Sequence, residues 1–328
     1  MKTFLTPSFS LLASISYLLA PAALSQPTEA WISRYNGGFT DKSHTPLAIK
    51  LDPVGNIYVA GSSQNASNVN DYVVLKYAPN GQLLWSARHS STNGGDYTLK
   101  GFALGTDGSV LLTGTGQTVK FGGDGGKVWT APYAGNDVAV DTIGNVYVTG
   151  FSTIHFATVK LNPGGTNLWV RTYADGLLPG DWQTESQKVA VDSTGRVYVA
   201  GWESYGAAWQ CYPGQPTLCR YFRPSVVAYD ASGNGTWTNA YTVGGANWGG
   251  TVAVIPDNQG NVYVTGNNTS SGSYYLTAKI SAAGQAAWLF EYGPPGVSAM
   301  AIEANGNCLL TGSTYKRFSD DTGMTTFK

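Results

Sequence analysis

Short apolar runs bounded by glycines recur along the chain and set its pattern of apolar and polar positions. Residues 146–149, Val-Tyr-Val-Thr, lie between Gly144 and Gly150, which are six positions apart. The first glycine of the six such pairs is Gly55, Gly108, Gly144, Gly195, Gly260 or Gly306. Short β-branched and apolar runs that end at turn residues are typical of buried strands. The pattern therefore predicts a repeated strand.

A second pattern follows most of these runs. An alternating segment ends in a lysine, a glycine comes five residues later, and a tryptophan comes four residues after that, as in Lys160, Gly165 and Trp169. Sets at 76, 81 and 85, at 120, 125 and 129, and at 279, 284 and 288 repeat it, while the fourth unit has Ala228 in place of the lysine. In the third unit the expected strands are 138–141, 146–149, 157–161 and 168–173, joined by turns of the kind that Asp-x-x-Gly favours.

Repeated units of four antiparallel strands predict an all-β fold, a six-bladed β-propeller. Residues 30–35, which include Trp31, match a fourth strand with no first three strands before it, and the last unit ends without a fourth strand. We expect the N-terminal strand to complete the last blade and close the ring, so that neither strand edge is left open.

The sequence Asp-x-x-Gly-Asn-Val-Tyr-Val-Thr-Gly at 141–150, followed by Lys-x-x-x-x-Gly-x-x-x-Trp, resembles the SBBP β-propeller repeat family of secreted bacterial proteins and, more distantly, NHL-type propellers. The resemblance covers nearly all of residues 31–328. It implies a propeller fold and export, but the family has no shared activity or catalytic residue to carry over. Gly105 replaces the repeated aspartate in the second unit, and Ala228 departs from the pattern in the fourth.

The N-terminal 25 residues have the pattern of a signal peptide. Lys2 supplies the charge, residues 11–24 are apolar, and Ala23-Leu-Ser25 fits a cleavage site. We expect residues 26–328 to form one propeller domain that is secreted, periplasmic or displayed at the cell surface. No later apolar run approaches the ~18 residues of a membrane span.

Charge and cysteines narrow the possible partners and the redox environment. The chain has 19 Lys and Arg against 20 Asp and Glu, with no basic run, which argues against binding to nucleic acid or to an anionic membrane. Cys211 and Cys219 bracket one loop, and in an exported protein this arrangement predicts a disulfide. Cys308 stands where other units have an apolar strand residue, and we interpret it as a buried apolar side chain.

Aromatic residues outside the repeat pattern are the candidates for ligand binding. In an antiparallel blade, the connections after the second and fourth strands share one face, and the long connections at 174–186, 203–224 and 242–250 all lie there. The predicted binding residues on these connections, or directly before one in the case of Trp202, are Trp182, Trp202, Tyr205, Trp209, Tyr212, Tyr221 and Trp248. They would form an aromatic depression suited to sugar rings or a peptide. The alternative is that the long insertion uses these aromatics for its own small core.

Catalytic signals are weak. The three histidines lack metal-ligand spacing, no Gly-x-Ser-x-Gly motif occurs, and we predict no catalytic residue, metal site or cofactor. Asp52, Asp141 and Asp192 are interpreted as turn caps rather than as a carboxylate ring around a metal. Asp181 and Glu203, on the same face as the aromatics, are the acidic pair that glycoside chemistry would need.

The sequence favours a secreted, monomeric, non-catalytic binding or scaffolding propeller. Its interaction face would lie on the long loops of the third to fifth blades, with a glycan, protein or peptide as ligand. Two alternatives stay open: a carbohydrate-active hydrolase or lyase that uses the loop carboxylates, and a purely structural cell-surface repeat protein.

Overall fold

The computed structural model describes residues 29–39, 41–91, 94–150, 156–173, 184–209, 218–241, 248–268, 275–292, 296–315 and 322–327. These residues form 23 strands and no helix. The strands make six antiparallel sheets, five of four strands and one of three. The predicted all-β class, built from repeated four-stranded units, is confirmed. The predicted signal peptide lies outside the described residues.

Each sheet is a meander in which neighbouring strands are consecutive in the chain. Sheet one is β1 (His44–Leu51), β2 (Ile57–Gln64), β3 (Asn70–Tyr77) and β4 (Leu83–His89). Sheet two is β5 (Leu99–Leu104), β6 (Val110–Gly114), β7 (Thr118–Phe121) and β8 (Lys127–Ala131), and sheet three is β9 (Asp137–Val140), β10 (Val146–Thr149), β11 (Phe156–Leu161) and β12 (Asn167–Tyr173). Sheet four is β13 (Thr184–Val191), β14 (Val197–Trp209), β15 (Leu218–Tyr229) and β16 (Gly235–Ala240). Sheet five is β17 (Trp248–Pro256), β18 (Val262–Asn268), β19 (Tyr275–Ile280) and β20 (Ala286–Tyr292), and sheet six is β21 (Val297–Ile302), β22 (Cys308–Tyr315) and β23 (Thr322–Phe327).

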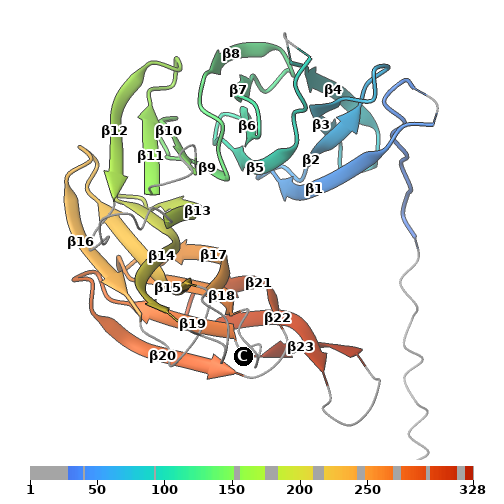
Figure 1. Ribbon diagram of the computed structural model, residues 1–328. Helices are drawn as coiled ribbons and strands as arrows, with labels where there is room; N and C mark the ends of the chain where they lie inside the picture. Colours follow the sequence, from blue (N-terminus) through green and yellow to red (C-terminus); the bar gives the residue numbers. More distant parts are fainter. Residues whose placement is uncertain are drawn as a thin grey trace, which may run out of the picture.

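The sheets follow one another around an arc, and their first strands lie on its inner side (Figure 1). The first strands of successive sheets contact one another, from β1 to β5 and onward to β21. Apolar clusters fill the space between neighbouring sheets. Val146 and Val148 on β10 belong to the cluster shared with sheet two, whereas Tyr147 belongs to the cluster shared with sheet four. Because alternate residues of a strand point to opposite faces, a strand buried on both faces reads as a continuous apolar run.

The repeated tryptophan of one sheet lies on the turn between the third and fourth strands of the next sheet. Trp129 donates its Nε1–H to the carbonyl of Pro163 at 2.9 Å, and its ring covers Gly165, where an added Cβ would sit 2.8 Å from the indole. Gly165 has a φ of +86°, so the turn needs glycine both for its backbone and for the ring above it. Trp85, Trp169 and Trp237 make the same contact with the following sheet. The repeated tryptophans therefore pack between neighbouring sheets.

The aspartates at the ends of the first strands cap turns, as predicted. Asp141 Oδ1 accepts the N–H groups of Ile143 and Asn145 at 3.1 and 2.8 Å. Asp52 and Asp192 accept from their own turns in the same way. These carboxylates therefore stabilise turns.

The turn that contains Asp230 predicts that the folded protein loses stability in acid. The side-chain amide and the backbone N–H of Asn234 hold the pKa of Asp230 below its ordinary value of 3.8. A carboxyl whose pKa is lowered in the folded state stabilises the protein above its unfolded pKa, and this contribution is lost as the pH falls through the folded pKa. We expect the free energy of unfolding, measured with urea, to decline below about pH 4. Asp230→Asn should weaken this dependence, because Asn162 already fills the equivalent turn position in sheet three. An unchanged pH dependence would contradict the assignment.

The N-terminal segment, residues 29–39, forms no strand and lies on sheet one. Trp31 donates its Nε1–H to the carbonyl of Pro79 at 3.2 Å and covers Gly81, which repeats the contact between successive sheets. Sheet six has β23 at its edge, and the described residues show no pairing between that edge and the N-terminal segment. The predicted ring closure is therefore not shown by the structure.

Candidate functional site

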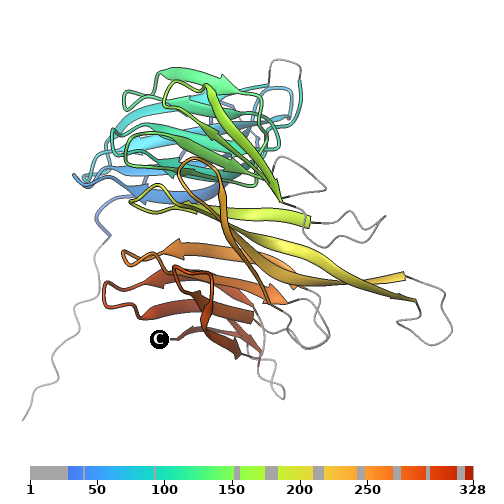
Figure 2. The same cartoon turned by 90° about the vertical axis from the view of Figure 1, so that its left-hand side faces the viewer.

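The second and third strands of sheet four extend beyond their sheet. β14 and β15 stay paired as far as Trp209 and Leu218. Among the described residues, the pairs with the neighbouring strands end earlier, at Thr184 with Glu203 and at Ala240 with Ser225. Among the described residues, 204–209 and 218–222 therefore pair only with each other. We call these two segments the β14–β15 ribbon; it projects beyond the other strands on one side of the molecule (Figure 2).

The structure brings several of the predicted aromatic residues onto this ribbon. Tyr205 and Trp209 are on β14, and Tyr221 is on β15 opposite Gly206. Trp248 begins β17 in the next sheet. Trp182 and Tyr212 lie outside the described residues, so their grouping with the others stays a prediction.

Trp202 is partly buried and packs against the core cluster between sheets four and five. That cluster contains Tyr198 and Val254. For this one tryptophan the structure therefore favours a packing role over a place in an open depression.

The cysteines are placed only in part. Cys219 is on β15 opposite Ala208, and Cys211 lies outside the described residues, so the disulfide stays a prediction. Cys308 is a free thiol on β22 that packs against the cluster of Val297 and Leu310, and burial raises its pKa.

A buried ion pair anchors the base of the ribbon. Arg223 donates from Nε to Glu203 Oε1 at 2.7 Å, and its Nη2 lies 2.6 Å from the same oxygen. The Glu203 side chain is 0% exposed, and its Oε2 has no hydrogen-bond partner among the described residues. Because Glu203 is enclosed and ion-paired, it holds β14 to β15 and presents no carboxylate to solvent. Asp181, its proposed acidic partner, lies outside the described residues.

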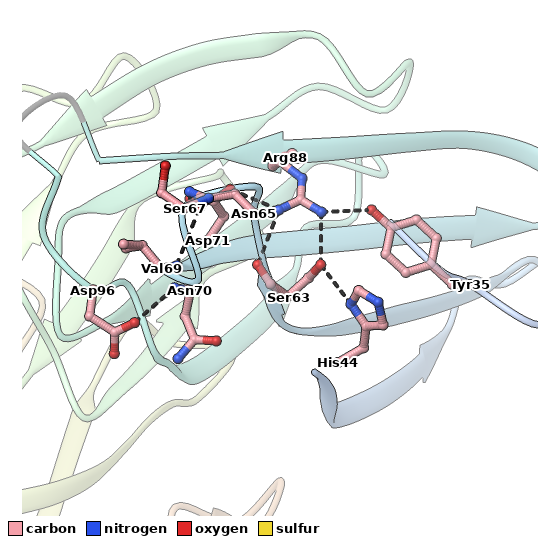
Figure 3. Close-up of polar contacts among 10 residues, drawn as sticks. All are labelled: Tyr35, His44, Ser63, Asn65, Ser67, Val69, Asn70, Asp71, Arg88 and Asp96. Carbon is pink, nitrogen blue, oxygen red and sulfur yellow. Dashed lines mark hydrogen bonds and ion pairs between the residues drawn. The ribbon is translucent and has the colours of Figure 1, made fainter. Parts of the chain in front are cut away.

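Sheet one contains a polar cluster centred on Arg88 (Figure 3). Arg88 donates from Nη1 to Asp71 Oδ2 and from Nη2 to Ser63 Oγ, both at 2.7 Å. Nη2 also donates to the hydroxyl of Tyr35 in the N-terminal segment, and Ser63 Oγ lies 2.8 Å from His44 Nδ1. Ser63 and Asp71 are buried. The cluster ties β2, β3 and β4 to the N-terminal segment.

The two clusters occupy equivalent places in their sheets. Ser63 and Glu203 each stand two residues after a repeated glycine, and they pair across the strands with Asp71 and Arg223, respectively. Neither Arg223 nor Asp71 is among the site residues predicted from the sequence. The sequence feature that could have identified them is a charged residue next to an otherwise apolar strand segment. In the structure that residue lies opposite the polar residue that stands two positions after the second repeated glycine.

The described residues offer little evidence for a catalytic or metal-binding site. His89 is buried between Tyr72 and Tyr97, and burial is the main cause that lowers its pKa, which favours the neutral ring. No group of three or more His, Cys, Asp or Glu side chains there could hold a metal ion. No helix there is long and apolar enough to cross a membrane.

Comparison with known proteins supports the fold class. The sequence matches no protein-family profile and no curated protein. Among solved structures, the chain is similar to the propeller of Dos1, with a TM-score of 0.55 and 10% identity over 84% of this chain and 69% of that one. It also matches BBS1N, from a complex with ARL6DN, at a TM-score of 0.47 and 10% identity over 81% and 74% of the two chains. A protein of unknown function from Bacteroides caccae matches at 0.45 and 13% identity over 76% and 82%.

The similarity to the Dos1 propeller, taken with the repeated antiparallel sheets, defines a β-propeller type of fold. At 10% identity it concerns the fold and leaves the ligand open.

Proposed function

We propose that this protein is a non-catalytic binding module whose β14–β15 ribbon contacts an extended polypeptide. The observation that carries the proposal is that the ribbon leaves its sheet and, among the described residues, has no strand neighbour on either outer edge. Unpaired strand edges offer backbone N–H and C=O groups to an added strand, and flanking side chains supply specificity. A glycan is the second candidate ligand, because Tyr205, Trp209 and Tyr221 are on this ribbon.

The base of the ribbon supports a binding role. Glu203 and Arg223 fix β14 to β15 where the ribbon leaves sheet four, so the projecting strands start from a rigid support. A rigidly held ribbon loses less conformational entropy when a partner binds to it. The enclosed carboxylate of Glu203 favours this role over glycoside hydrolysis, which needs two accessible carboxyl groups.

We further propose an exported, monomeric protein of six SBBP-type blades. The signal-peptide pattern of residues 1–25 supports export. The six sheets and the repeated contact between tryptophan and glycine support the repeat assignment.

The test removes the ribbon and keeps the sheet. Because Glu203 and Arg223 are directly opposite, residues 204–222 can be replaced by Asn-Gly, which favours a tight two-residue hairpin. The protein lacking its signal peptide is applied to peptide and glycan arrays, with and without this replacement. We expect peptide binding to be lost with the ribbon while the thermal unfolding midpoint changes little.

Point variants separate the interpretations. Trp209→Ala should weaken binding and leave folding intact, whereas Trp202→Ala should lower stability, because Trp202 packs on the core between sheets four and five. Binding that survives ribbon removal would overturn the proposal. Glycan turnover by the intact protein would favour the enzyme alternative.

A further inference from the structure

The repeated tryptophans all contact one kind of turn. In each case the turn follows the third strand of a sheet, and the last of its four residues is a glycine with positive φ. The carbonyl that accepts the indole N–H belongs to the second residue of the turn, which is Pro79, Gly123, Pro163, Ala231 or Ala282. Under the rings from Trp85 to Trp237, a Cβ added to the glycine would lie 2.6 to 2.9 Å from the indole. The contact therefore selects a turn with a small residue or proline second and glycine fourth.

In two sheets a lysine shares this carbonyl with the tryptophan. Lys120 Nζ and Trp129 Nε1 both donate to the carbonyl of Pro163, at 3.4 and 2.9 Å. Lys160 and Trp169 donate together to the corresponding carbonyl of sheet four, at 2.9 and 3.5 Å. Each lysine is directly opposite its tryptophan on the neighbouring strand. A lysine and a tryptophan placed in this way form a two-donor site for one carbonyl oxygen.

Sheet five has the same two donors without a turn for them to contact. Lys279 and Trp288 are directly opposite each other on β19 and β20. The Lys279 ammonium lies 4.0 Å from Asp257 Oδ2 and over the ring of Tyr263. In the part of the chain that the structure describes, neither this ammonium nor the indole N–H of Trp288 has a carbonyl acceptor. Trp288 is 38% exposed, whereas the other fourth-strand tryptophans are buried or partly buried.

A pocket adjoins Trp288 on the side of sheet six. Its volume is about 390 Å³, and its lining includes Trp288 and Phe290 of sheet five and Asn307, Cys308 and Leu310 of sheet six. Phe290 is 45% exposed. An apolar, partly aromatic hollow with a few polar donors is the usual form of a binding site. The indole donor of sheet five therefore lies beside open apolar surface.

We propose that this pocket, which we call the Trp288 site, binds a β-turn of a partner polypeptide with proline, alanine or glycine second and glycine fourth. The indole covers the glycine, and Trp288 Nε1 and Lys279 Nζ donate to the carbonyl of the second residue. The first turn of sheet six, at Gly306, lines the site. The β14–β15 ribbon instead extends the connection after a second strand. The Trp288 site is therefore separate from the ribbon and goes beyond the binding role proposed above.

A second copy of the chain is the competing partner. Its five turns between a third and a fourth strand each lie beneath an indole of their own, from Trp31 on Gly81 to Trp237 on Gly284. These turns are therefore not free to enter the Trp288 site of another copy. A different polypeptide that presents such a turn fits the site better.

The test uses a turn that this protein already contains. Residues 159–168 carry Asn-Pro-Gly-Gly between strand residues and contain no tryptophan. Because a short hairpin is only marginally stable in water, the peptide is cyclised head to tail, which also reduces the entropy lost on binding. The matched control peptide carries Gly165→Ala. Titration calorimetry with the protein lacking its signal peptide measures the dissociation constant of each peptide.

We expect the Gly165 peptide to bind and the Gly165→Ala peptide to show no measurable binding, because the added methyl group would collide with the indole. Trp288→Phe keeps an aromatic ring and removes the N–H, so it should raise the dissociation constant by about two- to tenfold, the range for one hydrogen bond. Lys279→Met removes the second donor and should weaken binding by a similar factor. Trp85→Phe is the matched control protein, because Trp85 already has its turn beneath it, and its affinity should not change.

A second measurement locates the bound peptide. Cys308 lines the pocket, so the peptide should slow alkylation of this thiol by iodoacetamide, followed by mass spectrometry. Equal binding of the two peptides, no binding of either, or an unchanged affinity in Trp288→Phe would overturn the proposal. Dimers in sedimentation that Trp288→Phe dissociates would assign the site to a second copy.

The ribbon variant keeps the two proposals apart. Replacing residues 204–222 by Asn-Gly leaves sheets five and six unchanged, so this variant should bind the cyclic peptide as tightly as the intact protein does. This result is expected whether or not the ribbon itself binds a ligand.

Discussion

Replacing Trp169 by alanine is expected to lower the free energy of unfolding by about 3–5 kcal/mol, the range for a buried tryptophan. Trp169 is 8% exposed, lies over Gly233 of the next sheet, and belongs to the core cluster between sheets three and four. The substitution removes the ring that packs these sheets together and leaves a cavity that the rigid strands cannot fill. Urea unfolding followed by circular dichroism measures the loss.

The matched control is Trp288→Ala in sheet five. Trp288 occupies the same repeat position but is 38% exposed. In the part of the chain that the structure describes, sheet six has three strands and so no turn between a third and a fourth strand beneath Trp288. We expect this substitution to cost roughly 1 kcal/mol, as is usual for a side chain outside the core. Equal losses at the two positions would show that the contact with the next sheet is not what makes Trp169 important.

Replacing Arg223 by alanine is expected to lower the free energy of unfolding by about 3–5 kcal/mol, because it leaves a buried charge without its partner. Glu203 is enclosed, and Arg223 is its ion-pair partner. Urea unfolding of the variant and of the unchanged protein, compared under the same conditions, measures the loss.

The double variant Glu203→Leu, Arg223→Met tests the cause. Replacing a buried pair by apolar residues of similar size is often neutral or stabilising, so this variant should regain most of the stability lost in Arg223→Ala. Ribbon binding should survive in it if the pair acts only as a support. A double variant as unstable as the single one would show that Arg223 acts through contacts other than Glu203.

Much of the fold could be predicted from the sequence because its signals are local and repeated. The first glycine of each unit, such as Gly144, adopts a positive φ, and the second, such as Gly201, lies in or directly after the second strand. The apolar run between them predicts a buried strand, and the structure buries it in sheets two to five. The fixed spacing of lysine, glycine and tryptophan identified the repeat, and the structure uses it to place Trp129 on Gly165 of the next sheet. Ring closure could not be predicted from such local patterns, because it depends on contacts between the two ends of the sequence.

The candidate site was less predictable because it breaks the repeat. The length of 203–224 identified it as an insertion, but whether it forms a loop or paired strands depends on the register between Trp209 and Leu218, which no local pattern shows. Glu203 was expected at an accessible position among the loop carboxylates. Its burial depends on Arg223, twenty residues away in sequence and directly opposite in the sheet.

The contact between tryptophan and glycine has a direction. Each indole, from Trp85 to Trp237, rests on a turn that comes later in the sequence. A chain that emerges from the ribosome N-terminus first would therefore complete each sheet only after the following sheet had formed its third strand. Trp31 meets its turn within sheet one, which makes that sheet, with its N-terminal segment, the natural starting point of assembly.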